Sequence, residues 1–118
     1  ACYTTTMLNA RLFMFTIVET PLYIKMVDSL LTKEEQGELH TMISQNPDIG
    51  DVVSKSGGVR TVRFARQGGG KSGGVRVIYY NRLENGKIFM LLVYAKAKTE
   101  NIPAHILKDL VKELDTWQ

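Results

Sequence analysis

The sequence predicts an α+β fold, with an antiparallel, mostly meander sheet of about four strands and helices packed on one of its faces. Three strand-like segments follow one another between residues 59 and 96, and glycine- or asparagine-containing loops link them. Two helical segments precede these strands and one follows them, in the order β-α-α-β-β-β-α. Helices gathered on one face would leave the other face of the sheet available for function.

The first half of the chain contains one strand and a helical hairpin. Leu12 to Glu19 is rich in β-branched and aromatic residues and predicts the first strand. Apolar residues between Leu22 and Leu31 recur at roughly helical spacing and predict a short helix. Thr32-Lys33-Glu34-Glu35 matches a capping box, so a second helix should begin there and end before Asn46-Pro47.

The second half predicts the meander and a final helix. Strands are expected at 59–66, 75–80 and 87–96, and Asn85-Gly86 is a strong hairpin signal between the last two. From Ile102-Pro103 onward, apolar residues repeat at helical spacing as far as Trp117.

The length of 118 residues fits one domain, predicted at 14–118, with 1–13 as a leader or N-terminal extension. The lone Cys2 excludes an internal disulfide framework, so a cytoplasmic location is expected. No apolar stretch approaches the roughly 20 residues that span a bilayer, so no membrane contact is expected. His40 and His105 do not form a pair by sequence, and no acidic cluster has metal-ligand spacing. We therefore expect neither a metal nor a cofactor.

Positive charge is concentrated in the second half of the chain. Residues 1–50 contain three basic and six acidic side chains, whereas residues 55–98 contain ten basic side chains and one acid, Glu84. A local excess of this size is typical of a surface that contacts phosphates. A solvated lysine-rich face would normally have acidic residues interspersed with the basic ones.

Side chains alternate along a strand, which predicts that Val62 and Phe64 point one way and Arg63 the other. If the meander is in register, Arg63, Arg76, Tyr94 and Lys96 converge on one face. The alternative is that the arginines only edge the sheet and stay hydrated. The further RNA-binding candidates are also basic: Arg60, Arg66, Lys71 and Lys98.

The segment from Ala65 to Ser72 satisfies a loose phosphate-binding P-loop pattern. A true P-loop leads into a helix, whereas Ser72 is followed by Gly73-Gly74 and a β-branched strand. We therefore reject a nucleotidase. Lys71 keeps a plausible role as a mobile cation that reaches RNA phosphate.

Four segments together resemble the RelE/ParE toxin superfamily, and most closely its HigB-like members. These segments are Gly58 to Ala65, the glycine-lysine loop, Gly74 to Tyr80 and Val93 to Lys96. The resemblance implies a messenger-RNA endonuclease that acts in the ribosomal A site. It also implies a partner antitoxin, expected to be a helix-turn-helix protein encoded by the neighbouring gene.

Within this resemblance, Arg63, Arg76 and Lys96 match basic positions of the family, and Arg76 matches the arginine beside the scissile phosphate. Ala97 and Pro103 stand where some members have an arginine and a stacking aromatic residue. That difference leaves the general acid and base open, with Lys71, Tyr94 and Lys98 as substitutes by position. Two other functions remain open: a ParE-like gyrase inhibitor that cuts no RNA, and a basic adaptor that only binds RNA.

Overall fold

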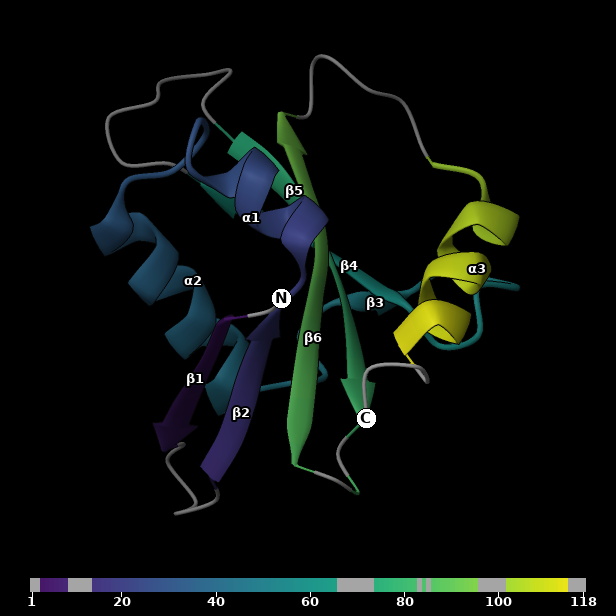
Figure 1. The fold of residues 1–118 in the computed structure, drawn as a ribbon, viewed down its shortest axis with the longest axis horizontal. Helices are drawn as coiled ribbons and strands as arrows, with labels where there is room; N and C mark the ends of the chain where they lie inside the picture. The colour runs from purple at the N-terminus through teal and green to yellow at the C-terminus, as the bar shows by residue number, and fades with distance from the viewer. Residues whose placement is uncertain are drawn as a thin grey trace.

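The computed structural model describes residues 3–8, 14–65, 74–82, 84, 86–95 and 102–114. Within these ranges the chain forms one six-stranded sheet, in the order β1-β2-β6-β5-β4-β3, and three helices (Figure 1). The strands are β1 (Tyr3–Leu8), β2 (Met14–Glu19), β3 (Asp51–Val52), β4 (Arg60–Ala65), β5 (Gly74–Arg82) and β6 (Lys87–Ala95). The helices are α1 (Pro21–Val27), α2 (Lys33–Gln45) and α3 (Ala104–Leu114).

The predicted α+β class and the antiparallel meander of β4, β5 and β6 are confirmed. The sheet is larger than expected, because β1 pairs with β2 and the short β3 pairs with β4. The sheet is also mixed, since β2 pairs with β6 in parallel. β1 lies within the segment 1–13, whose status as a leader or extension stays a prediction.

Both faces of the sheet carry helices, which corrects the expectation that all helices share one face. α1 and α2 pack on the side of Val77, whereas Leu107 and Leu114 of α3 cluster with Ile78 on the opposite side. Figure 1 shows α3 well separated from α1 and α2. Adjacent residues of a strand point to opposite faces, so Val77 and Ile78 define the two sides. β6 is buried at every position of 88–94, as expected for a strand covered on both faces.

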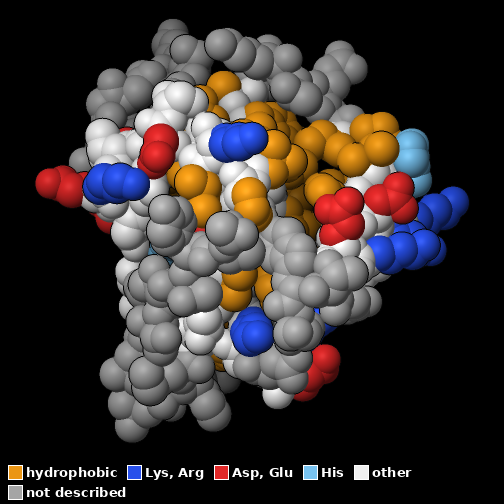
Figure 2. Space-filling view, viewed as in Figure 1, with side chains coloured by type: hydrophobic (Ala, Val, Ile, Leu, Met, Phe, Trp, Pro, Cys, Tyr) orange, Lys and Arg blue, Asp and Glu red, His pale blue; other side chains and the backbone are white. Residues whose placement is uncertain are grey.

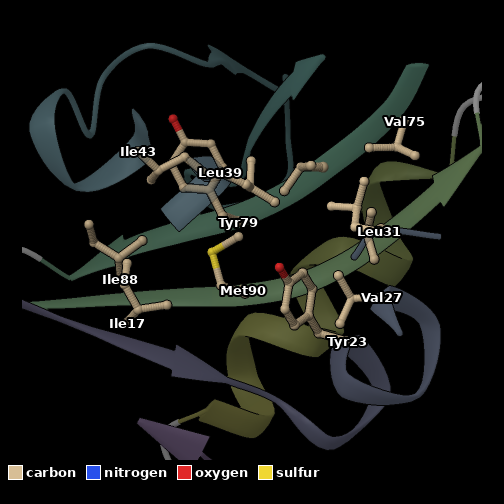
Figure 3. Close-up of a cluster of buried hydrophobic side chains, with 12 residues drawn as sticks. Ile17, Tyr23, Val27, Leu31, Leu39, Ile43, Val75, Tyr79, Ile88 and Met90 are labelled. Carbon is tan, nitrogen blue, oxygen red and sulfur yellow. The ribbon is translucent and has the colours of Figure 1, made fainter. Parts of the chain in front are cut away.

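The larger core cluster lies between the sheet and helices α1 and α2 (Figure 3). Its buried side chains come from both helices, from three strands and from the turn after α1: Ile17, Tyr23, Val27, Leu31, Leu39, Ile43, Val75, Val77, Tyr79, Ile88, Met90 and Val93. Burial of such a side chain stabilises the fold by about 1.5–3 kcal/mol. This core holds β5 and β6 in place as the base for the opposite face.

α1 begins at a capped end and continues beside β6. Thr20 Oγ1 accepts a hydrogen bond from Tyr23 N (3.3 Å) and donates one to the carbonyl oxygen of Met90 (2.9 Å). Pro21 follows at the start of the helix, where a missing N–H has no helical partner to lose. β2 pairs with β6 only as far as Met90, so α1 lies beside the remainder of β6. The helix ends at Val27, before the predicted Leu31.

The predicted capping box of the second helix is confirmed. Thr32 Oγ1 accepts a hydrogen bond from Glu35 N (3.1 Å), and Thr32 N donates to Glu35 Oε1 (2.8 Å). α2 ends at Gln45, with Asn46 as its C-cap, so Pro47 lies outside the helix as expected.

Tyr79 fastens the loop after α2 to the centre of the sheet. Its buried hydroxyl donates to the carbonyl oxygen of Pro47 (2.8 Å) and accepts from Gly50 N (2.9 Å). A Cβ at Gly50 would lie 2.9 Å from the Tyr79 hydroxyl, so glycine is required for this close approach.

Tyr79→Phe is expected to lower the free energy of unfolding by about 1–3 kcal/mol, because Gly50 N–H would be buried without an acceptor. Urea denaturation measures this loss. Tyr80→Phe is the matched control, since Tyr80 is half-buried on the opposite face and its ring contact with Arg82 survives the change. Equal stability of the two variants would show that the Tyr79 hydroxyl contributes nothing.

Candidate functional site

Arg63, Arg76 and Tyr94 form a row across three neighbouring strands. In the registers of the meander, Arg63 of β4 is opposite Arg76 of β5, and Arg76 is opposite Tyr94 of β6. Arg63 is exposed, Arg76 is half-buried and Tyr94 is only 7% exposed. The predicted convergence of these three residues on one face is confirmed. What they do chemically stays a prediction.

A β-bulge in β6 determines which face Tyr94 occupies. β6 contains one extra residue, Leu91, opposite residues 78–79 of β5. Met90 precedes the bulge and Val93 follows it, yet both side chains pack in the core beneath α1 and α2. The bulge therefore reverses the alternation of side chains along β6. Tyr94 is thereby turned to the face of Arg76 and joins the cluster on that side.

Arg76 is oriented by a neighbouring strand and affects the tyrosine beside it. Its Nη1 donates a hydrogen bond to Thr61 Oγ1 at 3.3 Å, a contact that the sequence did not indicate. Burial raises the pKa of Tyr94 above its usual value, and the Arg76 cation partly offsets this effect. Tyr94 therefore keeps its phenolic proton at neutral pH, so it can donate a hydrogen bond or a proton.

Four predicted site residues lie outside the described residues: Arg66, Lys71, Lys96 and Lys98. Arg66 directly follows the last residue of β4, and Lys96 directly follows the last residue of β6. These strand ends lie at the same end of the meander as Arg63, Arg76 and Tyr94. The contribution of the four side chains to the site stays a prediction.

The structure does not bring Arg60 to this row. Arg60 is opposite Tyr79 in the register, so it lies on the side of the larger core. Its guanidinium donates to the carbonyl oxygen of Gly50 (2.7 Å) and forms an ion pair with Asp48 (3.2 Å). Its predicted contact with RNA stays a prediction, and these protein partners indicate a structural role.

A further cation, Arg82, lies at the far end of the same face. Its guanidinium carbon is 5.6 Å from the centre of the Tyr80 ring and 5.7 Å from the centre of the Phe89 ring. Both distances are within the range of cation–π contacts. The charge of Arg82 is thus held over aromatic rings, away from the row of Arg63 and Arg76.

His40 belongs to a buried polar cluster, whereas His105 is exposed. His40 Nε2 is 3.1 Å from the Tyr23 hydroxyl and 3.4 Å from Glu19 Oε1. Burial lowers the pKa of His40 to about 4, so the imidazole is neutral at pH 7 and the contact with Glu19 is not an ion pair. The cluster lies on the α1 and α2 side of the sheet, opposite the row.

Two further classes of site are absent from the described part of the chain. None of its helices is long and apolar enough to cross a membrane. Likewise, no three histidine, cysteine or acidic side chains within the described ranges are grouped so that they could hold a metal ion. The glycine-rich segment 66–73 lies outside these ranges, but strand β5 rather than a helix follows it, unlike in a P-loop.

The fold and the row define a small α+β protein with a cationic sheet surface at one end of a meander. A family model described as the RelE toxin of the RelE/RelB toxin–antitoxin system matches residues 27–116, which is more than half of the chain. The chain therefore belongs to the RelE toxin family. Membership implies an antitoxin partner.

Proposed function

We propose that this toxin is a metal-independent endoribonuclease that inhibits translation by cutting messenger RNA in the ribosomal A site. The observation that carries the proposal is the row of Arg63, Arg76 and Tyr94, which presents two guanidinium groups and a phenol along one line of the sheet. Family membership supports it, because toxins of the RelE family are generally endoribonucleases. We also propose HigB-like membership within the superfamily, on the sequence resemblance.

The proposed reaction is an internal transfer at phosphorus. The ribose 2′-oxygen forms a bond to the adjacent phosphorus while the bond from phosphorus to the 5′-oxygen breaks. The products are a 2′,3′-cyclic phosphate and a 5′-hydroxyl. Negative charge grows on the phosphoryl oxygens in the transition state, and fixed guanidinium donors from Arg76 and Arg63 would stabilise it.

Two proton transfers accompany this reaction, and the described residues supply a group for one of them. Tyr94 stands beside Arg76 in the row and holds its proton at neutral pH, as a phenol does at its usual pKa and also when burial raises that pKa, so we assign it the proton donated to the departing 5′-oxygen. The 2′-hydroxyl proton needs a base. Lys96, Lys71 and Lys98 are the proposed candidates, provided that neighbouring cations lower the pKa of one of them.

The proposed partners follow from the same function. The ribosome supplies the messenger RNA, which places the toxin in the cytoplasm. The antitoxin is proposed to be a helix-turn-helix protein encoded by the neighbouring gene. Figure 2 shows hydrophobic side chains gathered between α1 and α3. Leu22 of α1 is 45% exposed and Ile106 of α3 is 42% exposed. Apolar surface of this kind favours contact with another protein.

A purified translation system tests the function. The protein should produce cuts in a translated message that follow the reading frame, and the same message without ribosomes should stay intact. Primer extension maps the cuts. Intact transcripts together with loss of DNA supercoiling by gyrase would contradict the proposal and support the ParE-like alternative.

A further inference from the structure

A groove runs between the end of α1 and the free side of β6. One wall consists of Lys25, Met26, Ser29 and Leu30, and the other consists of residues 93–95. Its volume is about 320 Å³, and it is open to solvent along its length. The groove exists because β2 stops pairing with β6 at Met90, which leaves the last part of β6 to α1.

The groove has the chemistry to hold a nucleotide. Lys25 is exposed and forms no salt bridge with a side chain in the described ranges, so its charge is available to an anion. Met26 and Leu30 are half-buried and provide apolar surface for the flat face of a base. Ser29 Oγ donates to the Met26 carbonyl oxygen (3.0 Å), which leaves its lone pairs free to accept a hydrogen bond.

The groove lies at the free edge of β6, where the row ends, because Met26 packs against the core clusters on both faces of the sheet. Tyr94 ends the row that starts at Arg63, and the same residue lines the groove. Neighbouring strands lie about 4.8 Å apart, so Arg63 and Tyr94 are separated by roughly 10 Å across the sheet. A single RNA strand whose phosphates contact Arg63 and Arg76 would therefore place its next nucleotide in the groove.

We propose that this groove is a nucleotide subsite of the enzyme, which takes the nucleoside flanking the scissile phosphate and contacts its phosphate through Lys25. The subsite rests on the proposed function. Its apolar walls accept the face of any base, and Ser29 contacts the base edge, so the groove contributes to codon preference. A protein partner in the groove is the alternative occupant, and the charge of Lys25 in the groove where the row ends favours RNA.

Photocrosslinking on programmed ribosomes tests the occupant. A photoreactive phenylalanine analogue replaces Ser29 in a chain that also carries Arg76→Ala, so that the message stays uncut. The crosslink should map to the A-site codon or its direct neighbour. The same analogue at Lys112, an exposed position on α3, should give no crosslink to the message.

Kinetics provide the second readout. Lys25→Glu should lower single-turnover cleavage about tenfold by repelling a phosphate, whereas Lys112→Glu should change it less than about twofold. Ser29→Trp should fill the groove and change the ranking of cleaved codons.

The outcomes separate the two proposals. If the unmodified protein cuts messages, but position 29 gives no crosslink to them and Lys25→Glu behaves like Lys112→Glu, the subsite is wrong and the endonuclease stands. A crosslink from position 29 to ribosomal protein or ribosomal RNA alone also overturns the subsite. A protein that neither binds ribosomes nor cuts messages overturns both.

Discussion

Arg76→Ala is expected to slow cleavage of messenger RNA by a factor of about 10²–10³, the usual loss when one charge-stabilising donor is removed from a transition state. Arg76 is at the centre of the row, with Arg63 on one side and Tyr94 on the other. No other described side chain takes its place, because Arg82 is held over aromatic rings at the far end of the face. Single-turnover cleavage on programmed ribosomes measures the effect.

The lower cleavage rate of Arg76→Ala should not result from unfolding of the protein. Among the described residues, the Arg76 side chain forms one hydrogen bond, the 3.3 Å contact with Thr61, so the free energy of unfolding should change by less than about 1 kcal/mol. Thr61→Val is the matched control, because it removes that contact and keeps the guanidinium. Its cleavage rate should fall far less than that of Arg76→Ala. Full activity of Arg76→Ala would remove this residue from the mechanism.

The row could be predicted because strand alternation is local. Arg63 and Arg76 each stand between apolar neighbours, and a period of two residues assigns each to a face without knowledge of the fold. Tyr94 is different. Alternation counted from Met90 would place Tyr94 beneath α1 and α2, and only the extra residue Leu91 brings it to Arg76. Its placement beside Arg76 therefore depended on a register that the sequence did not specify.

The features that the sequence did not predict depend on contacts between distant segments. β2 and β6 are far apart in the chain, so no turn signal indicated their parallel pairing. The prediction also placed α3 on the wrong face of the sheet, although the sequence contains one sign that both faces are covered. The apolar run of 88–94 has no alternation, which is typical of a strand buried on both faces.

The same reasoning explains which parts of the candidate site were missed. Thr61 was not singled out because a threonine in a strand is ordinary, and its contact with Arg76 requires the register of β4 and β5. Lys25 was counted among the few basic residues of the first half of the chain, remote from the arginines in sequence. It lines the same groove as Tyr94 only because α1 lies beside β6.

Acid is expected to destabilise the fold through His40. Burial lowers the pKa of His40 from 6.5 to about 4 in the folded protein, while the unfolded chain keeps the ordinary value. Between these values the unfolded state binds more protons, so stability is complete above pH 6.5 and is lost as the pH falls toward 4. A shift of this size corresponds to a loss of about 3 kcal/mol.

Protonation of Glu19 has the opposite effect on the stability of the fold, so its contribution must be measured separately from that of His40. Burial raises the pKa of Glu19, so the folded protein takes up this proton at a higher pH than the unfolded chain, and that uptake favours the folded state as the pH falls. Urea denaturation at a series of pH values should show a shallower loss in His40→Gln and a steeper loss in Glu19→Gln. Stability of the unmodified protein that stays constant from pH 6.5 to 4 would mean that His40 accepts its proton inside the fold and pairs with Glu19 across their 3.4 Å contact.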